Sequence, residues 1–508
     1  MKSKSEKSVM NIAVLALHEI VSLVCGIIAP RYFLLAFGSD YNGALSSITQ
    51  MCTFITLLRA GVTGASRLAL YKPLADNDTD KISAILMATQ RYMRRIAYLF
   101  IGYVGVLAVV YPFFGFKGNG WLDVASLVVI TALGTFAQYY FGLTYQTLLT
   151  ADQRHYIYSI IQIFAVIGNT IVTILLIKLG LDIHWVKLGS SIVFCLAPIA
   201  LNLYVSRIYR INKHAEPDSS VISGKKYVMT HAVANFVHEN TDIVLLTFFT
   251  DAATVSVYSV YYLVMNGIKK FMTIFTTGME SAFGNMWAKN EKENFRKNFG
   301  VFEFLIASFV SVVFSCTFAF ILSFVRLYTA GVTDTNYIRV CFAMVVCFAQ
   351  AVYCIRTPYV TAVQSCGKYK ETMNGAIIEA ALNLGLSLVL VYWFGLVGVA
   401  IGTLAANLFR TTQFSMYVYK NIIQKKYWQF VQKMFWVISN ITISLLVFHA
   451  CRFTIEAWMS WVLYGAICFI ISMLITIVMS FVFYRYEMTY SLKIIKKLLQ
   501  SGTKRKKG

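Results

Sequence analysis

The chain has 508 residues, of which 58% are hydrophobic and only 13% are charged. Together with a mean hydropathy of +0.64, this composition excludes an ordinary water-soluble enzyme or binding module. The formal net charge of +22 does not indicate nucleic-acid binding, because membrane proteins concentrate Lys and Arg in their cytoplasmic segments. The composition predicts an all-α, polytopic membrane protein.

Apolar stretches that reach the roughly 20 residues needed to cross a bilayer follow one another along the chain. In the first half, the predicted transmembrane helices are 9–35, 44–70, 96–116, 122–150, 156–178, 187–207 and 227–249. In the second half, they are 255–284, 299–324, 338–364, 372–394, 397–419, 432–450 and 458–484. The sequence therefore predicts fourteen transmembrane helices. An even number of spans places both termini on the same side of the membrane.

Basic residues in the connecting segments identify that side. With the N-terminus in the cytoplasm, most Lys and Arg residues outside the spans fall in cytoplasmic segments, including Arg91, Arg94, Arg95 and the tail from Lys493 to Lys507. The outer loops hold few of them. Since Lys and Arg concentrate on the cytoplasmic side, we expect both termini to be cytoplasmic.

Short matches between the two halves indicate an internal duplication. Phe136-Ala137-Gln138 in the fourth predicted helix corresponds to Phe348-Ala349-Gln350 in the tenth, and Leu179-Gly180 corresponds to Phe394-Gly395. Because six spans return to the starting side, the halves are parallel repeats, with a cavity expected between them. The predicted domains are the six-helix halves 1–210 and 211–424, followed by two extra helices and a basic tail in 425–508.

Charged residues inside the predicted spans are the strongest functional signal. The basic ones are Arg31, Arg59, Arg67, Lys269, Lys270, Arg339, Arg356 and Arg410. Each costs roughly 2.5–3.5 kcal/mol near the centre of a membrane helix, so such residues usually line a polar cavity. Those near span ends can instead extend to the interface. The acids available to neutralise them are fewer: Glu19, Glu239, Asp242, Glu280, Glu303 and Glu379.

The register of the repeat places Arg59 of the first half opposite Phe271, beside Lys269 and Lys270. Cations brought together at one depth repel each other unless an anion or carboxylate lies between them, which favours a phosphate-bearing ligand. Gln350, Tyr353 and Arg356 form one polar stripe at spacings of three. Arg31 follows Pro30, where a helix break exposes backbone groups. The predicted residues that bind a substrate headgroup are Arg31, Arg59, Lys269, Lys270, Gln350 and Arg356.

The seventh predicted helix has a polar stripe of its own: His231, Asn235, His238 and Asp242. With Glu239 it forms a candidate site for a coupling ion or proton, although a hydrogen-bonded network that packs membrane helices is an equal alternative. The chain contains no H-E-x-x-H, G-x-S-x-G, Walker A or G-x-G-x-x-G signature. We therefore expect no catalytic residues, no metal and no cofactor.

Two segments resemble a known family. They are PRYFLLAFGSDYNGALSSITQM with LLRAGVTGASRLALYKPLADNDTDKI, which together lie between Pro30 and Ile82, and TDIVLLTFFTDAATVSVYSVY from Thr241 to Tyr261. The chain resembles bacterial polysaccharide repeat-unit flippases of the multidrug/oligosaccharidyl-lipid/polysaccharide exporter superfamily. The resemblance implies a cationic cavity that takes the pyrophosphate and sugars of an undecaprenyl-linked oligosaccharide, which alternating access carries outward. Arg59 departs from the pattern, because related sequences carry an acid there.

The resemblance implies a bacterial cell-membrane flippase for surface polysaccharide assembly. Its expected partners are the lipid-linked oligosaccharide, membrane lipids and the polysaccharide polymerase machinery, with no nucleic acid. The alternatives are a cation-coupled multidrug antiporter and a lipid II flippase of the same superfamily. Excess basic residues argue against the antiporter, whose substrates are usually cationic. Short outer loops leave no room for the catalytic domain of a membrane polymerase or glycosyltransferase.

Overall fold

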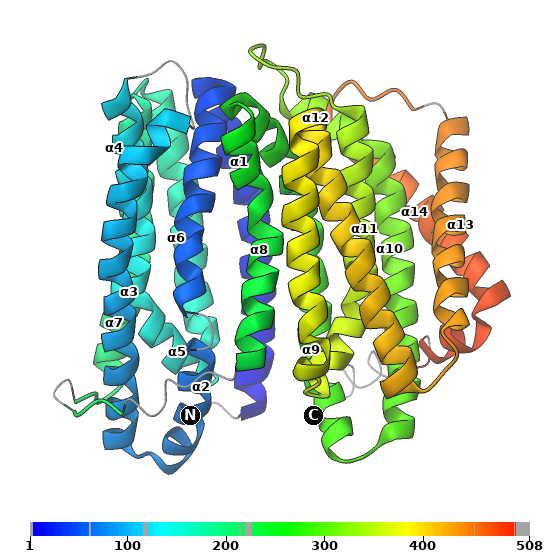
Figure 1. Cartoon of the computed structure of the whole chain (residues 1–508), viewed down its shortest axis with the longest axis horizontal. Coiled ribbons are helices and arrows are strands. Elements are labelled where there is room, and N and C mark those ends of the chain that lie inside the picture. The colour runs from blue at the N-terminus through cyan, green and yellow to red at the C-terminus, as the bar shows by residue number, and fades with distance from the viewer. Residues whose placement is uncertain are drawn as a thin grey trace, which may run out of the picture. The chain divides into compact units, whose positions relative to one another are not determined.

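The computed structural model describes residues 4–59, 62–114, 120–212, 215–218, 226–451, 453–491 and 493. Throughout these ranges the chain is built from helices and contains no strand (Figure 1). The predicted all-α class is confirmed.

The helices follow one another with short connections. The earlier ones are α1 (Lys4–Thr53), the 3-10 helix η1 (Phe54–Arg59), α2 (Val62–Asp76), α3 (Thr79–Phe114), α4 (Trp121–Ala137), the π-helix η2 (Gln138–Gly142), α5 (Leu143–Ala151), α6 (His155–Lys178), α7 (Ile183–Ile208) and α8 (Lys226–Phe249). The later ones are α9 (Ala252–Ala288), α10 (Lys292–Tyr328), α11 (Val340–Ser365), α12 (Tyr369–Tyr417), the π-helix η4 (Val418–Ile423), α13 (Trp428–Ala450) and α14 (Trp458–Phe483).

Two of these helices are each long enough to cross a membrane twice. At 1.5 Å per residue, the 50 residues of α1 and the 49 of α12 far exceed the roughly 30 Å hydrocarbon core. Each is broken at a glycine with positive φ, Gly38 (81°) and Gly395 (51°), a conformation that glycine adopts without steric cost. The breaks fall at the two positions where the sequence predicts short outer connections.

In the described part of the chain, ten helical stretches are long and apolar enough to cross a membrane, and two of them contain the glycine breaks. The protein is therefore a multi-pass membrane protein. Helices α8 and α9 are not among the ten. Both carry ionisable side chains along their length, including Glu239 and Asp242 on α8 and Lys269 and Lys270 on α9.

The chain forms two compact units, which are described separately here. The first unit comprises Met1–Leu263 and Gly331–Asn336, and the second comprises Val264–Ala330 and Tyr337–Gly508. The division falls within α9, so α8 belongs with the helices that precede it. The predicted halves 1–210 and 211–424 rest on the sequence repeat and stay a prediction.

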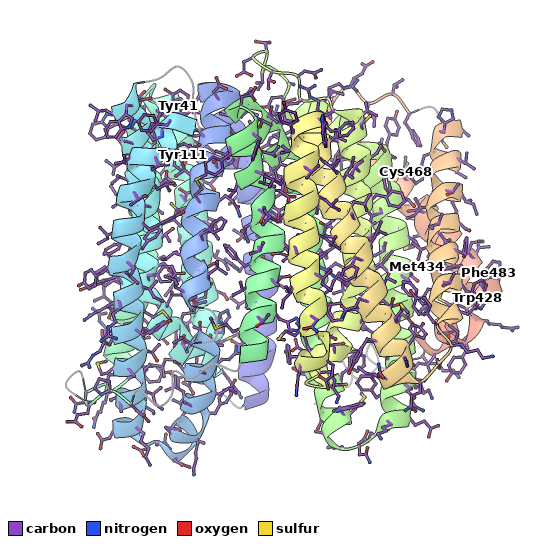
Figure 2. All side chains as sticks on the ribbon, viewed as in Figure 1. Tyr41, Tyr111, Trp428, Met434, Cys468 and Phe483 are labelled. Atoms are coloured by element: carbon purple, nitrogen blue, oxygen red, sulfur yellow. The ribbon has the colours of Figure 1, made fainter. Side chains whose placement is uncertain are left out.

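Helix α1 organises the first unit and contacts α4, α6 and α8. Gly43 permits a close approach to α9, because a Cβ atom there would lie only 1.7 Å from the carbonyl oxygen of Ala252. Tyr41 and Tyr111, both labelled in Figure 2, anchor α1 to its neighbours. The Tyr111 hydroxyl donates to the carbonyl oxygen of Ala44 at 3.2 Å, and the Tyr41 hydroxyl to Asp123 at 3.3 Å.

In the second unit, α10 packs against α11, α13 and α14 around an aromatic core that includes Phe283, Phe299, Tyr359 and Trp436. Figure 2 shows Trp428 and Phe483 at its periphery. These two side chains are 61% and 63% exposed, as expected of residues that face lipid or the membrane interface.

A buried carboxylate ties α13 to α10. Glu303 on α10 is 5% exposed and accepts a hydrogen bond from the ammonium of Lys433 on α13 at 2.5 Å. It also accepts from the hydroxyls of Tyr419, at 2.9 Å, and Tyr359. Sequence reasoning identified Glu303 as a candidate neutralising acid but missed Lys433. A lysine one turn from a helix end resembles any other interfacial lysine in sequence.

Replacing one member of this pair should destabilise the protein severely. Lys433→Met leaves a buried, uncompensated carboxylate, for which we expect a loss of about 3–5 kcal/mol in the free energy of unfolding. Glu303→Gln with Lys433→Met together should recover most of that loss. Unfolding of the purified protein in detergent measures both. Equal destabilisation in the single and double variants would contradict a charge-pairing role.

Candidate functional site

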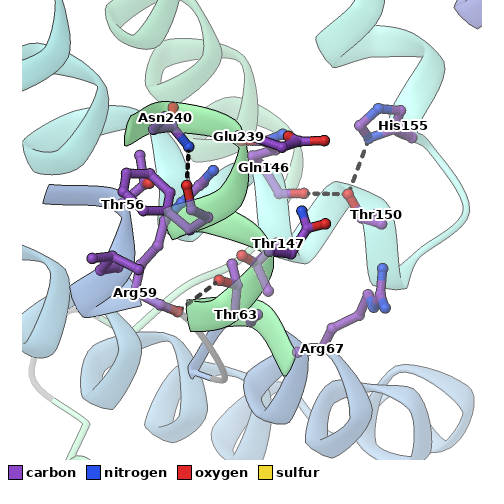
Figure 3. Close-up of a pocket in the computed structure, with 15 residues that line it drawn as sticks. Thr56, Arg59, Thr63, Arg67, Gln146, Thr147, Thr150, His155, Glu239 and Asn240 are labelled. Carbon is purple, nitrogen blue, oxygen red and sulfur yellow. Dashed lines mark hydrogen bonds between the residues drawn. The ribbon is translucent and has the colours of Figure 1, made fainter. Parts of the chain in front are cut away.

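A cavity of about 610 Å³ lies within the first unit (Figure 3). It is enclosed by η1, α2, α5, the start of α6 and one face of α8. Its lining residues are Thr56, Leu57, Arg59, Thr63, Gly64, Arg67, Gln146, Thr147, Thr150, His155, Ala232, Asn235, Phe236, Glu239 and Asn240. Most of these are polar, which is unusual for side chains inside a membrane protein and marks the cavity as a functional candidate.

Helical periodicity explains how the sequence builds these walls. On α8, Ala232, Asn235, Phe236, Glu239 and Asn240 recur at spacings of three and four, so they share one face. On α5, Gln146 and Thr150 are likewise one turn apart. The η1 segment ends at Arg59, where the chain passes into α2.

Hydrogen bonds within the lining fix several of its side chains. Thr150 Oγ1 lies 3.0 Å from His155 Nδ1 and donates to the carbonyl oxygen of Gln146 at 2.8 Å. Asn240 Nδ2 donates to the carbonyl oxygen of Phe236 at 2.6 Å. The Thr63 hydroxyl donates to the carbonyl oxygen of Arg59 at 3.3 Å. These bonds leave the guanidinium groups of Arg59 and Arg67 as the strongest donors available to a ligand.

The cavity carries an excess of positive charge. Arg59 and Arg67 line it together with a single carboxylate, Glu239. Neither arginine forms a salt bridge with any residue in the described ranges. His155, which lies within electrostatic range of Arg67, adds further positive charge when it is protonated. An anion bound here would relieve the repulsion between these groups.

The second unit places other predicted headgroup-binding residues in a separate cluster. The Tyr353 ring lies between two cations, with Lys269 Nζ 4.6 Å and Arg356 Cζ 4.7 Å from its centroid. Arg356 pairs with Glu379, which Arg410 also contacts at 3.2 Å. Gln350 is buried on the same helix as Arg356. Arg356 therefore has a protein counterion, as the count of intramembrane acids allowed.

Two further headgroup predictions have different outcomes. Arg31 is half-buried in α1, directly after Pro30, and does not line the cavity. Lys270 on α9 is exposed. Because Arg59 belongs to the first unit and Lys269 and Lys270 to the second, their expected meeting in one shared cavity stays a prediction.

The predicted polar stripe on α8 divides between two environments. Asn235 and the adjoining Glu239 line the cavity. His238 and Asp242 are buried, and Asp242 accepts a hydrogen bond from Tyr258 on α9 at 3.1 Å. His231 is half-buried and does not line the cavity. Of the predicted coupling residues, Glu239 is thus the one whose carboxylate faces the cavity.

The chain was compared with known proteins. No protein-family model matches it, and no curated protein is similar to it in sequence. The lipid II flippase MurJ, in an inward closed conformation, aligns with a TM-score of 0.68 and 15% identity, over 93% of this chain and 99% of MurJ. An inward-facing multidrug resistance MATE family transporter of the MOP superfamily aligns with a TM-score of 0.58 and 13% identity, over 82% of this chain and 98% of that one.

The chain has the fold of MOP superfamily transporters. A further member of this superfamily from Pyrococcus furiosus aligns with a TM-score of 0.56 and 13% identity, over 84% of this chain and 100% of that one. Its structure is described as having a binding pocket of reversed polarity that suggests a different function. The fold thus accommodates cavities of different charge, and function must be argued from the cavity of each protein.

Sequence reasoning found Arg59 and Glu239 but missed most of the cavity wall. Arg67 was identified as an intramembrane charge but not as a headgroup ligand, because its position near a span end is typical of interfacial residues. The hydroxyl and amide side chains of Gln146, Thr147 and Thr150 gave no separate signal, since threonine is common in membrane helices. His155 directly follows a short loop, and only the fold turns it toward Thr150.

The two kinds of arginine should differ in their effect on stability. Arg356→Gln leaves one side of the buried Glu379 carboxylate short of a partner, so we expect a loss of about 2 kcal/mol in the free energy of unfolding. Arg59→Gln removes no salt bridge within the described residues and should change stability by less than about 0.5 kcal/mol. Thermal unfolding in detergent compares them. A larger loss for Arg59→Gln would show that Arg59 serves structure rather than ligand binding.

Proposed function

We propose that this protein flips an undecaprenyl-pyrophosphate-linked oligosaccharide across the bacterial cytoplasmic membrane by alternating access, for assembly of a cell-surface polysaccharide. The observation that carries the proposal is the pair Arg59 and Arg67, which line one polar cavity with only Glu239 to oppose them. A transporter fold with a cationic cavity favours an anionic cargo.

The cavity offers suitable chemistry for both parts of such a headgroup. Guanidinium groups form bidentate, charge-assisted hydrogen bonds with phosphate oxygens, so Arg59 and Arg67 would hold the pyrophosphate. The hydroxyls of Thr56 and Thr147 and the amide of Asn235 can donate to and accept from sugar hydroxyls. At about 610 Å³, the cavity falls within the size range of ligand sites. The polyprenyl chain would stay in the lipid.

The direction of transport has a simple electrical explanation. Moving one charge through the membrane potential changes its free energy by about 2.3 kcal/mol per 100 mV. In a cell whose interior is negative, outward movement of a pyrophosphate headgroup is therefore favourable. Membrane potential alone can bias the flipping cycle, and a coupling ion at Glu239 would add to it. The polysaccharide polymerase machinery would consume the flipped product.

Two alternatives share this fold. A lipid II flippase would need the same pyrophosphate chemistry, and substrate competition separates it from the proposed function. A cation-coupled multidrug antiporter is favoured only by Glu239, which gives the cavity one acidic group. Two arginines facing that acid make the cavity unfavourable for an organic cation.

Neutralising the cavity arginines should impair flipping. In proteoliposomes carrying a polyprenyl-pyrophosphate oligosaccharide, we expect Arg59→Gln and Arg67→Gln each to slow transport 10- to 100-fold at subsaturating substrate, since a charge-assisted hydrogen bond contributes roughly 1.5–3 kcal/mol. Lys72→Gln is the matched control, because Lys72 is exposed on the same helix as Arg67 but does not line the cavity. Lys269→Ala and Arg356→Ala test whether the second cluster contributes.

Failure of the wild-type protein to flip any lipid-linked saccharide, together with export of small organic cations, would overturn the proposal in favour of the antiporter. Preference for lipid II over a polysaccharide repeat unit would assign the protein to the lipid II branch.

Acidic residues on α8 should separate by their environments. We expect Glu239→Gln to bind the anionic substrate several-fold more tightly and to remove any dependence of transport on a proton or sodium gradient. Asp242→Asn should retain that dependence, because Asp242 is buried against Tyr258. Transport measured under imposed gradients distinguishes the two. Loss of gradient dependence in Asp242→Asn alone would place coupling at the buried pair instead.

A further inference from the structure

A second cavity of about 530 Å³ lies in the first unit, beside α3, α5 and α7. Its lining residues are Met87, Gln90, Arg91, Arg94, Arg95, Tyr98, Tyr145, Asn202, Ala215 and Pro217. It shares no lining residue with the cavity around Arg59. The two cavities nevertheless use adjacent positions of α5, because Tyr145 lines one and Gln146 lines the other.

This second cavity is strongly cationic. Arg91, Arg94, Arg95 and Tyr98 are spaced as one face of α3, and no lining residue in the described part of the chain is a carboxylate. None of the three arginines forms a salt bridge with a described residue. Glu216 lies between two lining residues in sequence, but it is exposed and does not line the cavity. Three cations on one wall without an acid require a counter-anion.

Arg94 is the best-positioned ligand for such an anion. Its guanidinium lies over the Tyr140 ring, with Cζ 4.9 Å from the centroid. Its Nε atom is buried without a hydrogen-bond partner in the described structure. A buried donor left unsatisfied costs about 1–3 kcal/mol, more when it is charged. A phosphate oxygen in the cavity would satisfy a guanidinium of this kind.

The surroundings of the cavity favour a lipid phosphate over a free anion. Directly beyond the arginines, α3 exposes apolar side chains, with Leu99 63% and Ile101 53% exposed. On α7, Leu203 next to the lining residue Asn202 is 55% exposed. In a membrane protein such surfaces face acyl chains. The predicted topology places the arginine-bearing end of α3 at the cytoplasmic side, where basic pockets between helices bind anionic headgroups.

We propose that this second cavity is a binding site for the phosphate of an anionic membrane lipid, held by Arg91, Arg94 and Arg95 with its acyl chains along α3 and α7. A lipid bound here joins three helices of the first unit. Since α5 also forms a wall of the cavity around Arg59, occupancy of the lipid site would stabilise that wall.

Lipid binding to the purified full-length protein tests the proposal. Delipidated protein is titrated with phosphatidylglycerol, phosphatidylcholine or inorganic phosphate, and bound lipid is counted by native mass spectrometry. We expect phosphatidylglycerol to bind the wild type at least tenfold more tightly than phosphatidylcholine does. The triple variant Arg91→Gln/Arg94→Gln/Arg95→Gln should lose this preference. The charge-matched control is Lys72→Gln/Arg207→Gln/Arg210→Gln, because all three residues are exposed and none lines the cavity.

Should the triple variant misfold, Arg91→Gln/Arg95→Gln replaces it, since both side chains are exposed and their loss is compatible with folding. Equal phosphatidylglycerol binding by wild type and the cavity variants would overturn the site. Displacement of phosphatidylglycerol by an equal concentration of inorganic phosphate would show a free-anion site instead of a lipid site. Neither result depends on which substrate the protein transports.

Discussion

The structure is governed by the cost of placing charge inside a membrane. Each buried cation must have a carboxylate partner, a polar cavity or a ligand. The second unit uses the first solution, with Arg356 and Arg410 on Glu379 and Lys433 on Glu303. The first unit uses the second solution, because Arg59 and Arg67 face a cavity that contains one acid. This contrast separates charges that stabilise the fold from charges available to a substrate.

Helix α5 connects the two cationic cavities of the first unit. Its nine residues follow the π-helix η2, and a π-helical turn inside a longer helix is frequent at functional sites. One face of α5 presents Gln146 to the cavity around Arg59, while Tyr145 contributes to the arginine-lined cavity beside α3. A ligand in either cavity would therefore act on the same short helix, which gives a physical route by which the lipid environment can influence substrate binding.

The sequence predicts the helices well because their signal is strong. Breaks at Gly38 and Gly395 fall where hydropathy and glycine placement predict short connections. Side-chain partners are harder to predict, because they depend on which helices become neighbours. Glu303 was expected to neutralise one of the intramembrane cations, yet it pairs with Lys433 at a helix end. The stripe containing His238 and Asp242 was visible, but only tertiary packing shows that Glu239 faces the cavity instead.

The central claim is that Arg59 and Arg67 present uncompensated positive charge to a ligand. Its most direct test is the equilibrium affinity of the detergent-solubilised protein for a short polyprenyl pyrophosphate without sugar, measured by calorimetry as a function of salt concentration. The account predicts that binding weakens as salt rises and that Arg59→Gln/Arg67→Gln abolishes both the binding and its salt dependence. Tight, salt-independent binding that survives in the double variant would contradict it.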